Sequence, residues 1–178
     1  MKFYSGFSLS NDEQLFRPYL KSSKYCVAGF SYGAIKAFRQ VLDSKTRVDR
    51  LQLFSPAFFQ SRNDKFRRMQ KMYYAKDKEA YLKSFFSSCF LPVQPDGSVL
   101  LTEGSSEELE ELLSYEWKVD ELKSLQERGI EIEVYLGSED KIIEPQKAKE
   151  FFLPYATTYM INHAGHTLQT KTTKEEDE

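Results

Sequence analysis

The fold is decided by the stretch Tyr25-Cys26-Val27-Ala28-Gly29-Phe30-Ser31-Tyr32-Gly33. Its first four residues form a short apolar run typical of a buried strand, and from Ala34 onward the apolar residues fall on one face of a helix. Between strand and helix stands Gly-Phe-Ser-Tyr-Gly, which matches the pattern G-x-S-x-G. That pattern is typical of a sharp strand-to-helix turn that exposes a serine hydroxyl, where glycines leave room for crowded backbones. Ser31 is therefore the candidate nucleophile, and an ordinary glycine-rich turn is the alternative.

Further short apolar runs occur on both sides of this turn. They predict strands at residues 2–5, 25–28, 50–54, 130–136 and 157–161. Helical patterns separate the strands, and the first helix is expected from Asn11 to Leu20. Strands that alternate with helices predict an α/β fold with about five mostly parallel strands.

Two of the expected strands alternate between apolar and polar residues, whereas a parallel sheet that is covered on both faces is apolar throughout. The polar members are Arg50, Gln52, Glu131 and Glu133. One face of the sheet is therefore expected to be open to solvent or covered by a second copy of the chain. The second option makes a homodimer one of the expectations.

Composition excludes several classes of protein. The chain has 178 residues, which suits one domain, and its 25 Lys and Arg against 27 Asp and Glu argue against a nucleic-acid binder. No apolar run approaches the ~20 residues that a membrane helix needs. Two cysteines, Cys26 and Cys89, make neither a disulfide framework nor a set of metal ligands. We expect a cytoplasmic protein without a metal or a membrane partner, and an unstructured tail at residues 170–178.

A serine nucleophile needs a base, and the chain offers two histidines, His163 and His166, both after the last expected strand. His166 is the favoured base and His163 the alternative. The acid should follow the fourth expected strand, where Asp140 is favoured and Glu139 is its neighbour. Alternatively, Asp140 belongs to a turn and caps the helix that follows.

The three favoured residues occur in the order Ser, Asp, His, and the sequence resembles the α/β-hydrolase superfamily over almost its whole length. It is most similar to the compact BioV-type pimeloyl-acyl-carrier-protein methyl ester esterases of biotin synthesis. Tyr4-Ser5-Gly6-Phe7-Ser8-Leu9 resembles the oxyanion segment of that family, His-Gly-Trp-Gly-Leu. The resemblance implies a minimal α/β-hydrolase fold and a serine carboxylesterase that needs no cofactor. It also implies that the backbone N–H groups of Phe7 and Tyr32 hold the oxyanion.

Residues 60–120, between the third and fourth expected strands, have a helical period and are expected to form an inserted cap. Residues 62–83 hold eight basic and three acidic residues, and residues 103–127 hold nine acidic and two basic ones. In the simplest interpretation these are solvated helix faces that balance each other. The resemblance implies another role, because an acidic acyl carrier protein would bind to the basic stretch.

The candidate carrier-binding residues are Arg62, Lys65, Arg67, Arg68 and Lys71. The aromatic residues between them, Phe66, Tyr73 and Tyr74, are expected to face inward along an acyl channel. The resemblance implies hydrolysis of the methyl ester of pimeloyl-acyl carrier protein. A general short-chain esterase or thioesterase, and a hydrolase fold that serves only in protein interaction, are the alternatives.

Overall fold

The computed structural model describes residues 1–94 and 97–171, and a five-stranded parallel sheet lies at its centre. In spatial order the strands are β1 (Lys2–Tyr4), β3 (Cys26–Phe30), β4 (Arg50–Phe54), β6 (Glu131–Gly137) and β7 (Thr157–Ile161). A second, two-stranded sheet pairs β2 (Leu9–Ser10) with β5 (Leu100–Leu101) in antiparallel fashion. The expected α/β fold with about five mostly parallel strands is confirmed. From residue 172 on, the expected unstructured tail lies outside the described residues.

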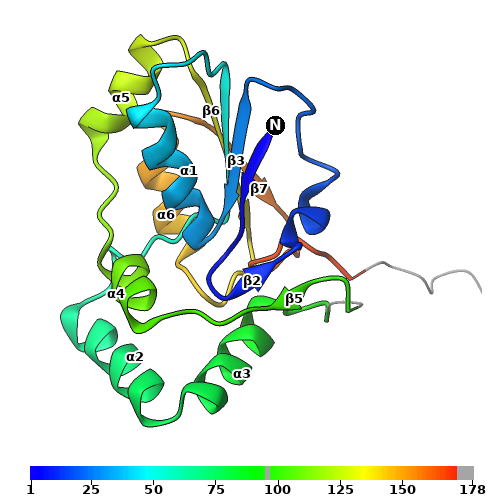
Figure 1. Cartoon of the computed structure of the whole chain (residues 1–178), viewed down its shortest axis with the longest axis vertical. Coiled ribbons are helices and arrows are strands. Elements are labelled where there is room, and N and C mark those ends of the chain that lie inside the picture. The colour runs from blue at the N-terminus through cyan, green and yellow to red at the C-terminus, as the bar shows by residue number, and fades with distance from the viewer. Residues whose placement is uncertain (95–96, 172–178) are drawn as a thin grey trace, which may run out of the picture.

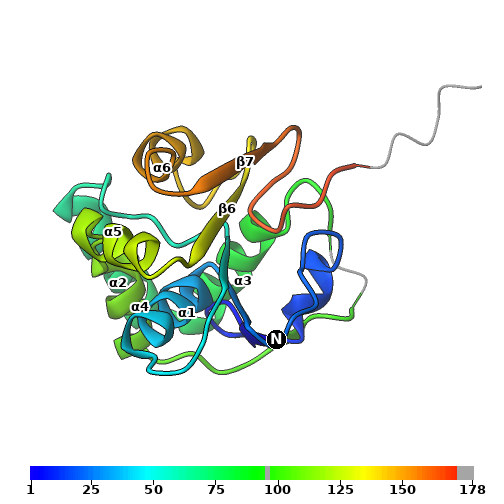
Figure 2. The ribbon, with the colours of Figure 1, turned by 90° about the horizontal axis from the view of Figure 1, so that it is seen from above.

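Three helices cover one face of the sheet (Figure 2): α1 (Tyr32–Asp43), α5 (Val119–Glu127) and α6 (Pro145–Phe152). The apolar stripe of α1, formed by Ile35, Phe38 and Val41, is fully buried in the main core. Helix α5, the last part of the acidic stretch, packs on β6 beside α1. No helix in the described part of the chain has both the length and the apolar character needed to cross a membrane.

Three more helices lie beyond the carboxyl ends of the strands (Figure 1), within the segment expected to form a cap. They are α2 (Asp64–Lys76), α3 (Lys78–Cys89) and α4 (Ser106–Ser114). Side chains define where they begin: Asn63 accepts the Phe66 N–H at 2.9 Å, and Asp77 accepts the Ala80 N–H at 3.0 Å. The name "cap" is used below for residues 60–120.

The segment between β1 and β3 differs from the expectation. The sequence pattern predicts a helix from Asn11 to Leu20, but this segment has a single short 3-10 helix, η1 (Asp12–Phe16). Pro18 explains the difference, because it has no N–H to donate to the carbonyl of Gln14 and its ring crowds that carbonyl. After η1 the chain crosses the second face of the sheet as an irregular segment (Figure 2).

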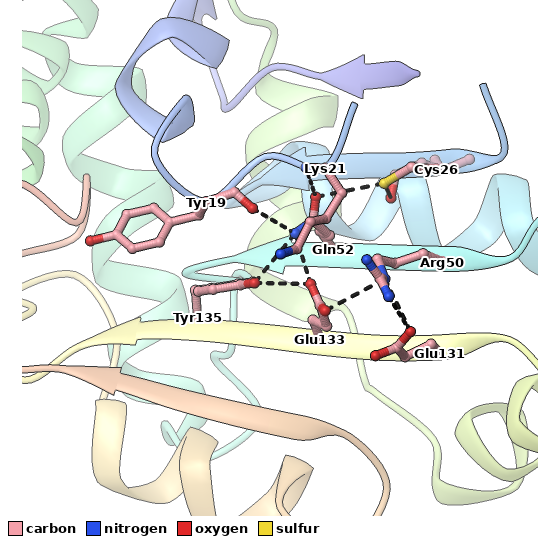
Figure 3. A network of polar contacts seen from close by, with 9 residues as sticks. Tyr19, Lys21, Cys26, Arg50, Gln52, Glu131, Glu133 and Tyr135 are labelled. Carbon is pink, nitrogen blue, oxygen red and sulfur yellow. Dashed lines mark hydrogen bonds and ion pairs between the residues drawn. The ribbon is translucent and has the colours of Figure 1, made fainter. Parts of the chain in front are cut away.

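That segment also corrects the expected solvated face of the sheet. Gln52 and Glu133 are buried, with 0% and 3% of their surface exposed. The Gln52 side chain accepts the Lys21 N–H at 3.0 Å and donates to the Tyr19 carbonyl at 2.9 Å and to Glu133 at 2.8 Å (Figure 3). The Tyr135 hydroxyl donates to the same Glu133 oxygen at 2.9 Å. Gln52 thus bonds to the chain's own covering segment, and Glu133 is bonded to Gln52 and Tyr135 beneath it.

At the edge of this network Arg50 pairs with the exposed Glu131 and lies 3.5 Å from Glu133 (Figure 3). The Cys26 sulfur lies 3.6 Å from the Gln52 oxygen, and burial raises the pKa of its thiol to about 11. Since the polar strand residues are satisfied within one chain, they no longer argue for a second copy. The homodimer stays a prediction.

Candidate active site

Ser31 occupies the sharp turn between β3 and α1. Its backbone has φ 54° and ψ −114°, a conformation that is costly for a residue with a side chain. The surrounding backbone holds it there. Its N–H donates to the Phe54 carbonyl at 2.9 Å, and its carbonyl accepts from Ala34 at 3.1 Å and Ala57 at 3.2 Å. The strained turn is therefore fixed by strand β4 on one side and by the helix on the other.

The glycines two residues before and after Ser31 are required by space. A Cβ atom on Gly29 would lie 2.2 Å from the carbonyl oxygen of Gly33, and one on Gly33 would lie 2.0 Å from the carbonyl oxygen of Tyr4. Because the nearest atoms at both positions belong to the backbone, they cannot move aside for a side chain. The same contacts place the end of β1 directly against the start of α1.

The structure brings His166 and Asp140 to Ser31. His166 Nε2 lies 2.9 Å from Ser31 Oγ, and His166 Nδ1 lies 2.6 Å from Asp140 Oδ2. The side chains of His166 and Asp140 are both completely buried. The second oxygen of Asp140 accepts the N–H groups of Ile142 at 2.7 Å and Ile143 at 3.1 Å. Asp140 is therefore the partner of the histidine and also an acceptor in the turn, but it does not cap α6, whose N-cap residue is Glu144.

The loops after β6 and β7 are joined by backbone hydrogen bonds, which set the positions of Asp140 and His166. Ser138 N–H donates to the Ile161 carbonyl at 3.0 Å, and Glu139 N–H donates to the Ala164 carbonyl at 2.8 Å. The two residues therefore project from neighbouring loops at the carboxyl edge of the parallel sheet. This is the edge where ligands commonly bind in open α/β sheets.

The alternative histidine and acid form a separate pair. His163 has 85% of its side chain exposed, and its Nδ1 lies 3.1 Å from Glu139 Oε1. The pair makes no contact with Ser31 among the described residues.

The backbone N–H groups of Phe7 and Tyr32 donate no hydrogen bond within residues 1–94 and 97–171. Tyr32 is the first residue of α1, so its N–H has no acceptor inside the helix. The rings of Phe7 and Tyr32 lie 6.4 Å apart, which places the two residues next to each other. Both N–H groups are free to bind an oxygen atom, as an oxyanion hole requires.

The side chain of Tyr32 connects this site to the cap, a link that no motif indicated. Its hydroxyl donates to Glu111 on α4, and Arg39 pairs with the same carboxylate. Lys36 pairs with Glu108 at 3.1 Å and lies 4.2 Å from the centre of the Tyr32 ring. Burial and the Glu111 carboxylate raise the pKa of the Tyr32 hydroxyl, which is therefore a neutral donor.

Phe7 makes a second connection to the cap. Its buried ring lies 6.4 Å from that of Tyr74 on α2 and 6.2 Å from that of Phe85 on α3. Tyr74 in turn donates its hydroxyl to the Gly104 carbonyl at 2.8 Å. All three cap helices thus touch a residue that carries one of the two free N–H groups.

A cavity of about 410 Å³ lies between the cap and the core. Aromatic and aliphatic residues form much of its wall, among them Phe59, Phe66, Tyr73, Phe85 and Ile142. Phe85 contacts Phe7, and Ile142 donates to Asp140, so the cavity borders the site. Ser31 itself does not line it. Of the three aromatic residues expected along a channel, Phe66 and Tyr73 line the cavity, and Tyr74 instead packs on Phe7.

The basic candidates of the cap fall into two groups. Arg62 lies 3.6 Å from Glu144, Arg67 lies 3.7 Å from Asp64, and Lys71 pairs with Glu110 on α4. These three are engaged within the chain, as the charge-balance interpretation expects. The other two candidates are exposed and make no ion pair with another described residue: Lys65 and Arg68.

Solved structures share this arrangement of strands and helices. An esterase (EaEST) from Exiguobacterium antarcticum has a TM-score of 0.62 at 18% identity, over 79% of this chain and 59% of that one. MenH from S. aureus has a TM-score of 0.57 at 13% identity, over 93% and 85% of the two chains. The chain has the α/β-hydrolase fold.

Naproxen esterase (carboxylesterase NP) from Bacillus subtilis has the same α/β-hydrolase fold, with a TM-score of 0.56 at 17% identity over 80% of this chain. The chain spans 59% of the length of the Exiguobacterium esterase and 53% of that of naproxen esterase. No protein-family model and no curated protein sequence matches it.

Proposed function

We propose that the chain is a serine carboxylesterase in which Ser31 is the nucleophile, His166 the general base and Asp140 the residue that orients the base. One observation supports this most strongly. An unbroken line of hydrogen-bond contacts runs from Ser31 Oγ through both nitrogens of His166 to Asp140, at 2.9 and 2.6 Å, inside the protein. The two backbone N–H groups that Asp140 also accepts hold its carboxyl in place as the acceptor for the Nδ1–H of His166.

The reaction follows from this geometry. Ser31 Oγ attacks the ester carbonyl carbon while His166 Nε2 takes its proton, and the carbonyl oxygen becomes an oxyanion that accepts from the N–H groups of Phe7 and Tyr32. The intermediate collapses, and the imidazolium gives its proton to the departing alkoxide, which leaves as an alcohol. A water molecule then attacks the acyl-serine with His166 as base, and Ser31 regains its proton when the acid leaves. These residues need no metal or organic cofactor.

The substrate that we propose is the methyl ester of pimeloyl-acyl carrier protein, which would yield methanol and the free carboxylate in biotin synthesis. This part rests on the resemblance of the oxyanion segment, and of Leu53-Phe54-Ser55-Pro56-Ala57 at the end of β4, to the compact BioV-type esterases. The aromatic cavity beside the site, about 410 Å³ in volume, offers room for an acyl chain. A cytoplasmic location belongs to the same proposal, and the two buried cysteines are free thiols, as a reducing compartment would keep them.

The acyl carrier protein is the partner in this proposal, and α2 is the element that we propose it contacts. Lys65 and Arg68 lie one turn apart on that helix and have no ion pair with another described residue to give up on binding. Met72, 57% exposed, lies one turn further along and adds an apolar contact. Arg62, Arg67 and Lys71 contribute less in this proposal, because they are already paired within the chain.

Two measurements test the proposed function. A fluorophosphonate probe should label Ser31 in the wild-type protein. Mass spectrometry of carrier-linked pimeloyl methyl ester should show that the methyl ester becomes a carboxylic acid, a mass decrease equal to CH₂, while the acyl chain stays on the carrier. Release of the whole acyl group from the carrier would identify a thioesterase instead. Turnover of small esters alone would identify a general esterase, and failure of the probe to label Ser31 would favour a protein that serves only in interaction.

A further inference from the structure

A buried carboxylate that the proposed reaction does not use lies beneath the oxyanion segment. Asp12, the first residue of η1, has no exposed surface. Its Oδ2 accepts the N–H of Gly6 at 2.9 Å, and its Oδ1 has no partner among the described residues. Burial raises the pKa of this carboxyl, although the Gly6 N–H and the neighbouring Ser5 hydroxyl act in the opposite direction.

The hydrogen bond from Gly6 fixes the peptide plane just before the one that carries the Phe7 N–H. The next plane is fixed from its carbonyl side, because the Gly6 carbonyl accepts the Leu9 N–H at 3.2 Å. In a trans peptide the carbonyl and the N–H point in opposite directions, so the Phe7 N–H must point away from this turn. The Asp12 bond thus holds the peptide plane before Gly6, and the Leu9 bond holds the plane after it. The Phe7 N–H can change direction only if one of these two hydrogen bonds breaks.

Stability alone gives little reason for an acid at this position. A buried carboxyl with one unpaired oxygen costs free energy, and an apolar side chain would fill the same space without that cost. The backbone hydrogen bond that the carboxyl accepts comes from Gly6, in the oxyanion segment. A neutral acceptor of the same shape could make that bond, because the other oxygen has no partner to lose.

We infer that Asp12 is a positioning residue that holds Gly6 so that the Phe7 N–H points to the developing oxyanion, an inference that rests on the proposed function. Asp12 touches neither Ser31 nor the substrate in this proposal. It acts only through the backbone of Gly6, and what it supplies is a hydrogen-bond acceptor at a fixed place.

The test compares Asp12→Ala, Asp12→Ser and Asp12→Asn, with Glu13→Ala as an exposed neighbouring control. Alanine and serine cannot reach the Gly6 N–H, whereas the asparagine carbonyl can accept it. For a nitrophenyl ester, kcat should fall about 10- to 100-fold in the alanine and serine variants, while KM changes less than about twofold. The asparagine variant should stay within about threefold of wild type, and so should the control. Equal losses in the alanine and asparagine variants, or unchanged kcat in folded alanine or serine variants, would overturn the inference.

A second readout does not depend on catalysis. In ¹H–¹⁵N correlation spectra of ¹⁵N-labelled protein, Gly6 and Phe7 should each give a single amide cross-peak in wild type and Asp12→Asn. In Asp12→Ala and Asp12→Ser these cross-peaks should be broadened or doubled. Unchanged Phe7 signals in those two variants would overturn the positioning role. If Ser31 resists the fluorophosphonate probe, the proposed function fails, and the Phe7 signals still decide whether Asp12 fixes this segment.

Discussion

The turn around Ser31 and the helices of the cap are built by different kinds of interaction. At the turn, the contacts are made by backbone groups. Hydrogen bonds to Phe54, Ala34 and Ala57 hold the strained backbone of Ser31. At both flanking glycines, a backbone oxygen lies about 2 Å from the position that a Cβ atom would take. Such contacts tolerate no other residue types. A short motif can therefore identify the turn.

In the cap, side chains dominate. Helix α4 is joined to α1 through Glu111 and Glu108 and to α2 through Glu110, all of them on partly exposed surfaces. Ion pairs of this kind contribute little each and can be exchanged for others. The comparison teaches that the proposed chemistry is specified by backbone geometry, whereas the proposed choice of substrate depends on surface side chains that many sequences could supply.

The largest effect should come from the turn itself. Ser31→Ala should lower kcat by about 10⁴-fold or more, because the members of a triad act as a unit. Its thermal melting should match wild type, since the backbone bonds of the turn remain. Turnover above about one per cent of wild type in the folded variant would show that another group is the nucleophile.

The two histidines provide the next comparison, within one loop. His166→Ala should be nearly as severe as Ser31→Ala, whereas His163→Ala should keep activity within about threefold, because its side chain is exposed and pairs with Glu139, away from Ser31. Single-turnover kinetics on a nitrophenyl ester measures both variants. The opposite ranking would reassign the base to His163.

A smaller effect is expected from the cap. Reversing Lys65 and Arg68 together to Glu should lower kcat/KM for carrier-linked substrate about tenfold at low salt, and less as salt rises. Hydrolysis of a nitrophenyl ester should not change, because that substrate does not meet the outer face of α2.

The matched control for this pair reverses Lys45, which follows α1, and Lys123, which lies on α5; both are exposed. Helix α5 lies at the end of the molecule opposite α2 and α3 (Figure 1). Both changes alter the net charge equally. If the control lowers kcat/KM as much as the cap variant, the effect comes from overall charge and docking on α2 is wrong.

The smallest effect tests the link between the two regions. Tyr32→Phe removes the hydroxyl that bonds Glu111 but keeps the backbone N–H of residue 32. Stability should fall by about 1 kcal/mol, as for one lost hydrogen bond, and kcat for a small ester should stay within about twofold. Denaturant titration measures the change in stability, and steady-state kinetics measures the change in kcat. A drop in kcat of about 100-fold would mean that the hydroxyl, and not only the N–H, serves the oxyanion hole.

The sequence alone predicts the parts of the molecule that depend on local pattern. The five strands follow from short apolar runs, and the position of Ser31 follows from glycines that the backbone requires. The partnership of His166 and Asp140 could be expected because both follow strands that end at one edge of a parallel sheet.

Features that depend on distant contacts escape such reasoning. Gln52 and Glu133 look solvated in an alternating strand, and only the path of residues 19–21 over the sheet shows that they are buried. Asp12 reads as an ordinary helix-start residue, because nothing local reveals its bond to Gly6. Likewise, the pairing of Arg62 and Lys71 depends on Glu144 and Glu110, which lie far away in the sequence.

The two residues with free N–H groups also anchor the cap, since Phe7 packs on Tyr74 and Phe85 and Tyr32 bonds Glu111. This has a consequence for protein engineering. A chimera that received the cap of another protein with this fold would leave the Tyr32 hydroxyl buried without an acceptor and a void beside the Phe7 ring. The cap is therefore not an independent module, and a graft that changes specificity must carry matching side chains at positions 7 and 32.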